Sequence, residues 1–249
     1  MSKNLEPPIP ISKGEIQMFK KSLKYVWTTV IWVAVFGIAM GFMESIVVVY
    51  IRKLCYPQGF HFLLNREVLE VLTFEWLREC ATIVMLVSVA VLAGKDFLMR
   101  FACFLISFAL WDIFYYFGLK LLLDWPYSLF TWDILFLIPI TWLGPVLAPL
   151  ICSLTMILLA GILLSIRGRG ARSLKPFEWG LILSGTAAIF ITFIWDSLRI
   201  TIQEGYLLHV WTLLKNEGLL QRILMHMPTR YHWSVFVCGE VAILSAIAL

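Results

Sequence analysis

The sequence has too few charged residues for a soluble protein of its length. Only 14% of its 249 residues are Asp, Glu, Lys or Arg, and 61% are hydrophobic, whereas about 25% of the residues in an average soluble domain are charged. A soluble globule of this size needs more polar surface than the chain supplies. The composition therefore argues against a soluble protein and predicts one that lies in a lipid bilayer.

Cysteine motifs and catalytic signatures are also missing. The five cysteines form no C-x-x-C pair and no zinc-type spacing, and a disulfide between Cys55 and Cys80 and a free thiol at each are both compatible with the sequence. The phosphate-binding, dinucleotide-binding, G-x-S-x-G and H-E-x-x-H patterns are absent. No apolar segment has a central histidine, which argues against haem. These absences leave the reaction class open.

The positive charges of the chain indicate membrane topology. The net charge is +4, but the basic residues lie in short loops and are not interleaved with aromatics along one face, so nucleic acid is excluded as a partner. Basic residues gather in segments 1–24, 94–100 and 167–175, which fall on one side of the predicted topology. By the positive-inside rule both termini are cytoplasmic, in a plasma membrane or a bacterial inner membrane.

Six apolar segments predict an all-α, multi-pass helical bundle, since about 20 helical residues cross the hydrocarbon core. Residues 1–24 are predicted to form a cytoplasmic basic tail, and residues 25–249 a six-span transmembrane domain. Gly37 and Gly41 form a G-x-x-x-G pattern in the first span, which predicts close contact with another helix. The predicted spans are 25–50, 76–93, 97–118, 143–166, 177–202 and 232–249.

Two segments between the spans carry further predictions. The 34 residues from 133 to 166 are too many for one spanning helix and contain Pro139, Pro145 and Pro149. Residues 133–141 are therefore predicted to form a short half-helix or re-entrant piece before the fourth span, since irregular backbone at membrane depth needs a protein or cavity lining. Residues 203–231 are predicted to form two amphipathic helices on the outer membrane surface.

Carboxylates at membrane depth are the candidate functional groups. An ionised carboxylate in hydrocarbon is costly, so each must face a protein interior, a water cavity or a cation. In the predicted topology all of them fall in the outer half of the membrane, whereas scattered structural acids would be divided between the two leaflets. This convergence predicts one acidic, outward-facing pocket. Its predicted members are Glu44, Glu79, Asp112, Asp196 and Glu240, with Asp133, His226 and His232 at its mouth.

Purely structural roles compete with this interpretation at some positions. Asp196 has Arg199 three residues later, and an ion pair within one helix explains it equally well. Glu79 has a basic neighbour at a helix boundary, which favours a structural role. Glu44 and Asp112 have no basic residue within one turn of their own helices. They need partners from elsewhere in the fold, which favours function.

A metal-assisted enzyme acting on a lipid or another membrane-soluble substrate is the first functional hypothesis. Carboxylates with an imidazole suit iron, manganese or zinc, and the metal would activate water or oxygen. The absence of an E-x-x-H pair counts against the known di-iron patterns. The predicted catalytic residues are Glu44, Asp112 and Asp196, and the predicted metal ligands are Glu44, Glu79, Asp112, Asp196 and His232.

Two other hypotheses use the same residues. The carboxylates would serve a proton- or cation-coupled transporter of a small molecule, with the proline-broken segment as its gate. Alternatively, the chain would be a non-catalytic subunit whose buried polar groups hold it to a partner membrane protein.

Overall fold

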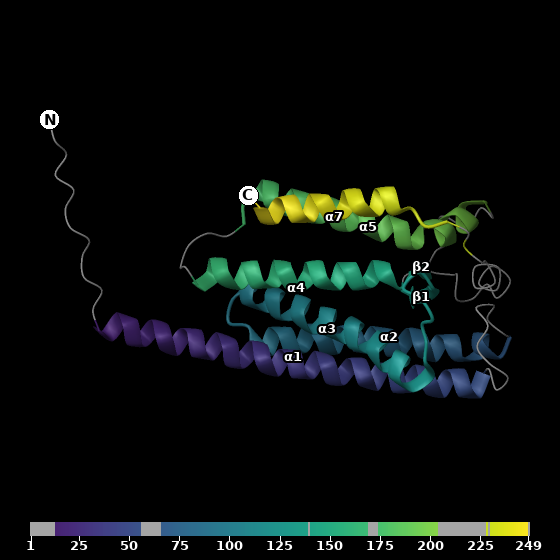
Figure 1. Cartoon of the computed structure of the whole chain (residues 1–249), viewed down its shortest axis with the longest axis horizontal. Helices are drawn as coiled ribbons and strands as arrows, with labels where there is room; N and C mark the ends of the chain where they lie inside the picture. The colour runs from purple at the N-terminus through teal and green to yellow at the C-terminus, as the bar shows by residue number, and fades with distance from the viewer. Residues whose placement is uncertain are drawn as a thin grey trace.

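A bundle of long helices, arranged side by side along one axis, forms most of the protein (Figure 1). The computed structural model describes residues 13–55, 66–138, 140–168, 174–203, 228 and 230–248. Within these ranges, five helices are long and apolar enough to cross a membrane, which supports the predicted membrane class. They are α1 (Lys13–Cys55), α2 (Arg66–Ala93), α3 (Phe97–Leu123), α4 (Leu147–Gly168) and α5 (Pro176–Gln203).

The last helix is shorter than the other five. Helix α7 (Trp233–Ala248) has 16 residues, fewer than the about 20 that cross a hydrocarbon core, and it lies along α5 (Figure 1). The sixth span and the orientation of the bundle therefore stay predictions. Residues 204–227, which hold most of the predicted amphipathic surface helices, lie outside the described residues.

The bounds of three helices differ from the bounds of the predicted segments, while the division into a cytoplasmic tail and a transmembrane domain stays a prediction. Helix α1 begins at Lys13, so the predicted tail over 1–24 is helical in its second half. The last proline of this region is Pro10, and the lysines that follow it are good helix formers. Helix α3 continues to Leu123, beyond the predicted end at residue 118. Helix α4 begins at Leu147 and not at residue 143.

The half-helix predicted over 133–141 is wrong, because residues 133–136 belong to a strand of a β-hairpin. The alternative of a re-entrant piece stays a prediction. Strand β1 (Trp132–Phe136) pairs antiparallel with β2 (Trp142–Pro145), with Asp133 opposite Gly144. Aromatic and β-branched residues favour strands, and a proline at position 139 is unsuited to a helix interior. The hairpin lies at one end of the bundle, between the end of α3 and the start of α4 (Figure 1).

Glycines allow two pairs of helices to approach closely. A Cβ atom at Gly41 would lie 2.6 Å from the carbonyl oxygen of Trp111, so the close contact predicted from G-x-x-x-G is confirmed, with α3 as the partner of α1. In the same way, a Cβ atom at Gly185 of α5 would lie 2.6 Å from the carbonyl oxygen of Gly239 in α7.

These contacts divide the bundle into two groups of helices. Helix α3 packs against α1, α2 and α4, whereas α5 packs mainly against α7 and β2. The groups meet at the hairpin end, where Ser197 Oγ donates a hydrogen bond to the Thr141 carbonyl at 2.6 Å. They meet again toward the opposite end, where the Trp179 ring lies 5.6 Å from the Phe101 ring. A cavity lies between these two contacts.

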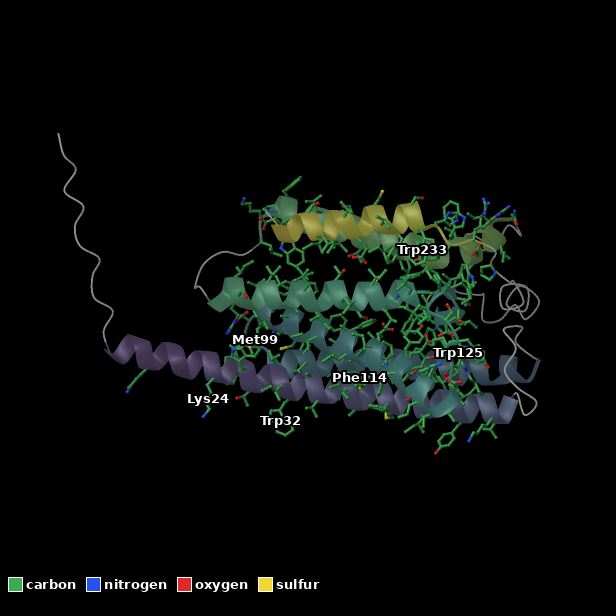
Figure 2. All side chains as sticks on the ribbon, viewed as in Figure 1. Lys24, Trp32, Met99, Phe114, Trp125 and Trp233 are labelled. Atoms are coloured by element: carbon green, nitrogen blue, oxygen red, sulfur yellow. The ribbon has the colours of Figure 1, made fainter. Side chains whose placement is uncertain are left out.

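The outer faces of the helices carry large apolar side chains. Trp32 on α1 is 68% exposed and points away from the bundle (Figure 2). Leu92 and Leu183 are similarly exposed on α2 and α5. Such faces are suited to contact with lipid.

Candidate functional site

An apolar cavity of about 450 Å³ separates α3 and α4 from α5 and α7. This volume falls within the range of about 300–1,000 Å³ that is typical of small-molecule sites. Aromatic and aliphatic side chains form nearly all of its wall, and two carboxyl groups, Asp112 and Glu240, interrupt it. Its lining includes Phe104, Phe108, Met156, Ile189, Phe190 and Phe193.

A smaller cavity of about 150 Å³ lies beside the first, between α1, α2, α3 and the hairpin. Its wall is rich in charged and phenolic side chains. The two cavities share Trp111, Asp112, Leu135 and Phe136. The polar residues that line the smaller cavity are Glu44, Arg52, Glu75, Arg78, Glu79, Asp112, Tyr115, Tyr116 and Asp133.

Arg78 of α2 holds two carboxylates of the smaller cavity. It donates hydrogen bonds to Glu44 of α1 and, through Nε at 2.9 Å, to Glu75 on its own helix. The side chain of Glu44 is only 8% exposed, so its charge depends on this partner. The prediction that Glu44 finds its partner on another helix is confirmed. The sequence places Arg78 beside both Glu75 and Glu79, and of these two it bonds to Glu75.

Glu79 bonds to the hairpin. Its Oε2 accepts a hydrogen bond from the Leu137 backbone N–H at 2.8 Å, and the residue is buried. This bond joins the segment after β1 to α2. Glu79 therefore both lines the smaller cavity and fastens the hairpin that closes it.

Asp133 is a member of the site that sequence reasoning placed only at its mouth. The Tyr116 hydroxyl donates to its Oδ2 at 3.2 Å, and Arg52 Nη2 lies 4.0 Å from its Oδ1. Arg52 also stacks over the Trp125 ring, which lies near the hairpin end of the bundle (Figure 2). Burial raises the pKa of Asp133 to about 6, although Arg52 and the Tyr116 hydrogen bond lower it. A carboxylate within an otherwise apolar strand is the sequence signal for such a buried group.

Asp112 lies where the two cavities meet. Ser153 of α4 donates a hydrogen bond from Oγ to its Oδ2 at 2.8 Å, and Ser153 itself is fully buried. Glu240 lies on the wall of the apolar cavity and accepts a hydrogen bond from Thr155 Oγ1 at 2.6 Å. Both contacts join carboxylates to hydroxyl groups of α4. No local pattern in the sequence indicates either of these partners.

The predicted five-residue metal set is only partly brought together. Glu44, Glu79 and Asp112 line the smaller cavity, but Asp196 and His232 line neither cavity. Asp196 is half-buried on α5, and the His232 ring contacts the Trp195 ring at 5.0 Å. In the described ranges, no group of three or more His, Cys, Asp or Glu side chains is arranged to hold a metal ion. The catalytic and metal-binding roles stay predictions.

Asp133 makes the stability of the hairpin depend on pH. Its folded-state pKa of about 6 lies above its ordinary value of 3.8, so the folded protein binds the proton more tightly than the unfolded chain does. The resulting stabilisation is complete below pH 3.8 and is lost as the pH rises through 6. Relative to the Asp133→Asn variant, the wild type is therefore expected to lose on the order of 2 kcal/mol between pH 4 and pH 7.

Thermal unfolding of both proteins across this pH range measures the effect. Asp124→Asn is the matched control, because Asp124 lies at the exposed end of α3 with 83% of its side chain accessible. A difference in stability between the wild type and the Asp133→Asn variant that stays constant across this pH range would contradict the prediction.

Comparisons with known proteins give no further guidance. No family model matches the chain, and neither a curated protein nor a solved structure matches it. The chemistry of the two cavities is therefore the basis for assigning a function.

Cys80, for which the sequence leaves a disulfide with Cys55 open, is a free thiol.

Proposed function

We propose that the protein is a membrane-embedded enzyme that acts on a lipid-soluble substrate. The apolar part of the substrate occupies the cavity between the two groups of helices, and its reacting polar group lies at Asp112. One observation carries this proposal: Asp112 is part of the wall of both an apolar and a charged cavity. An amphiphilic molecule has an apolar part and a polar part, and the junction of an apolar with a charged cavity accommodates both.

The lining of the larger cavity favours a substrate that comes from the bilayer. Phenylalanine, leucine and isoleucine side chains dominate it, so binding is driven by burial of apolar surface. The few polar groups on such a wall set the orientation of the ligand. Helix faces next to the cavity are apolar on the outside as well, which suits entry from lipid.

Asp112 is the residue proposed to carry the chemistry. A carboxyl group that contacts both bound substrate and a polar cavity is placed to accept or donate a proton as a general acid or base. The Ser153 hydrogen bond fixes the orientation of one of its oxygens. Glu44 and Arg78 form a charged pair in the neighbouring cavity. Asp196 lies outside both cavities and has no role in this proposal.

The proposed orientation has the charged cavity near the outer face of a plasma membrane or bacterial inner membrane. Lys24 lies toward the end of the bundle opposite the hairpin (Figure 2). Arg100 lies near the start of α3 and Arg167 near the end of α4, and Arg167 forms an ion pair with Asp96 just before α3. Basic residues favour the cytoplasmic side, and this supports an outward-facing hairpin end.

Filling the apolar cavity tests the proposal. Met156 lines the cavity, and the larger side chain in Met156→Trp would occupy space that a bound molecule needs. Overpacking a filled site costs about 1–3 kcal/mol, so the amount of co-purified lipid-soluble molecule is expected to fall about tenfold. Mass spectrometry of organic extracts from the purified proteins, compared with added standards, measures this amount.

Leu154→Trp is the matched control. Leu154 lies on the same helix and is 63% exposed, so a tryptophan there leaves the cavity unchanged. Equal occupancy in the wild type and both variants, or a wild type that retains no such molecule, contradicts the proposal.

Elemental analysis of the same preparations tests the metal hypothesis. Stoichiometric iron, manganese or zinc that is lost in Glu44→Ala and Asp112→Ala would support metal-assisted chemistry. A metal-free protein with pH-dependent ligand binding would favour transport over metal-assisted catalysis.

Proton- or cation-coupled transport is a second candidate, and the packing of the helices favours it. The α5 and α7 pair meets the rest of the bundle chiefly at β2 and α4, and both carboxyl groups of the apolar cavity lie at this boundary. Transport by rocking of one helix group against another uses a site of this kind. Substrate-dependent proton movement into liposomes that contain the protein, without chemical change of the substrate, would favour transport over catalysis.

A further inference from the structure

The smaller cavity carries more negative than positive groups. Within the described ranges, its wall holds five carboxyl groups and two guanidinium groups. The carboxyl groups belong to Glu44, Glu75, Glu79, Asp112 and Asp133, and the guanidinium groups belong to Arg52 and Arg78. A cleft lined by one sign of charge concentrates ligands of the opposite sign. The charge of this cavity therefore indicates the class of molecule that it binds.

Both arginines of the cavity already face carboxylates. Arg78 Nη2 lies 2.7 Å from Glu75 Oε2, and the same side chain bonds to Glu44. Arg52 Nη2 lies 4.0 Å from Asp133 Oδ1. A phosphate or carboxylate on a ligand would draw an arginine away from these partners and leave a buried carboxylate without its cation. An anionic ligand group is therefore disfavoured.

Glu79 and Asp112 accept hydrogen bonds from neutral donors. The Leu137 backbone N–H donates to Glu79 Oε2 and Ser153 Oγ donates to Asp112 Oδ2, each at 2.8 Å. A neutral donor satisfies an oxygen atom but does not balance a charge. Even when both residues are protonated, three other carboxyl groups face two arginines, so the cavity stays negative. An ammonium group supplies a positive charge together with N–H donors.

The rest of the ligand follows from the walls of the two cavities. They share Asp112, and the larger one is lined by apolar side chains such as Phe104, which suit a hydrocarbon chain. Trp111, Tyr115 and Tyr116 add aromatic rings to the wall of the charged cavity. Aromatic rings are common in sites that bind ammonium groups.

We propose that the two cavities together bind a lipid-soluble amine, with its ammonium group in the charged cavity beside Asp112 and Glu79 and its hydrocarbon chain in the apolar cavity. This inference rests on the proposed function, because it names the substrate class of the same site. The negative charge of one cavity and the apolar wall of the other carry it.

A series of probes with the same chain length and different charges tests the class. The full-length protein in phosphatidylcholine nanodiscs is incubated at pH 7 with trace isotope-labelled dodecylamine, 1-dodecanol or dodecyl phosphate, and bound probe is measured against empty nanodiscs. A primary amine is protonated at this pH. The amine is expected to bind about tenfold more tightly than the alcohol, because hydrogen bonds between charged groups are stronger than neutral ones. The phosphate is expected to bind more weakly than either.

Two single substitutions locate the ammonium group. Asp112→Asn and Glu79→Gln each remove a negative charge, while the amide oxygen can still accept the hydrogen bond from Ser153 or Leu137. Each is expected to weaken amine binding about tenfold and to leave alcohol binding within about twofold of the wild type. Retained alcohol binding also shows that the variant is folded. Asp124→Asn is the matched control, because it removes a negative charge from a side chain that is 83% exposed, and it is expected to keep the wild-type preference.

The outcomes separate the possible failures. Alcohol that binds as tightly as the amine, or tightest binding of the phosphate, overturns the amine assignment but leaves the proposed function intact. A full amine preference in both Asp112→Asn and Glu79→Gln overturns the placement of the ammonium group. Binding of none of the three probes above empty nanodiscs rejects the proposed function together with this inference. Where a variant does not fold, the wild-type series decides.

Discussion

Replacing Arg78 with methionine is expected to lower the free energy of unfolding by about 3 kcal/mol, the low end of the range for breaking a buried ion pair. Arg78 bonds to both Glu44 and Glu75, and its own side chain is 23% exposed. Methionine keeps much of the length of the side chain but leaves Glu44 buried without a cation. Thermal unfolding in a single detergent measures the change as a lower midpoint.

A second substitution separates the lost pair from lost packing. Adding Glu44→Gln to Arg78→Met removes the buried charge and is expected to recover most of the stability, since a neutral amide is less costly to bury. Lys120→Met serves as a control, because its ion pair with Asp124 is exposed on both sides and contributes at most about 1 kcal/mol. If the double variant is no more stable than Arg78→Met, the uncompensated charge is not the cause.

Replacing Gly41 with leucine is expected to destabilise the protein by at least about 3 kcal/mol, the upper end of the usual cost of overpacking. A Cβ atom at this position would lie 2.6 Å from the Trp111 carbonyl oxygen and 2.9 Å from the Tyr115 nitrogen. Both atoms are backbone, so α1 and α3 must separate to make room. Lower yield of folded protein and a lower thermal midpoint report the effect.

Gly161→Leu is the matched control for this substitution. Gly161 is also helical, but a Cβ atom there meets no other atom within 4 Å. Leucine at 161 is therefore expected to leave the midpoint unchanged or to raise it, because leucine favours helix more than glycine does. Equal losses of stability in the two variants would show that the contact between α1 and α3 is not what Gly41 protects.

The sequence predicted the long helices because their signal is local. A run of about 20 apolar residues has few alternatives to a spanning helix, and α1 to α5 fall where such runs occur. The hairpin has a weaker signal. A short apolar segment such as WDILF fits a strand or part of a helix equally well, and the pairing with WLGP depends on contacts that the sequence does not display.

The sequence predicts how deep in the membrane the site residues lie, but not the direction in which their side chains point. Helical rise places Glu44 and Asp112 at similar distances from the end of the membrane, and the structure brings both to one cavity. Which way a side chain faces depends on how the helices pack. Asp196 and His232 therefore lie outside both cavities, although their positions along the chain suggested membership.

Partners across helices were the hardest contacts to predict. Arg78 is next to Glu79 in the chain, yet it bonds to Glu44, which lies 34 residues away. Glu79 instead accepts the backbone N–H of Leu137. Residues next to each other in a helix point about 100° apart and do not face each other, so the side chains of Arg78 and Glu79 meet different neighbours.

The hairpin couples the two cavities mechanically. Leu135 and Phe136 of β1 line both cavities, so this strand separates the apolar cavity from the charged one. The carboxylate of Glu79 anchors the chain one residue beyond this strand. Displacement of this strand therefore changes the shape of both cavities at once. A molecule that binds in one cavity and displaces the strand changes the volume of the other.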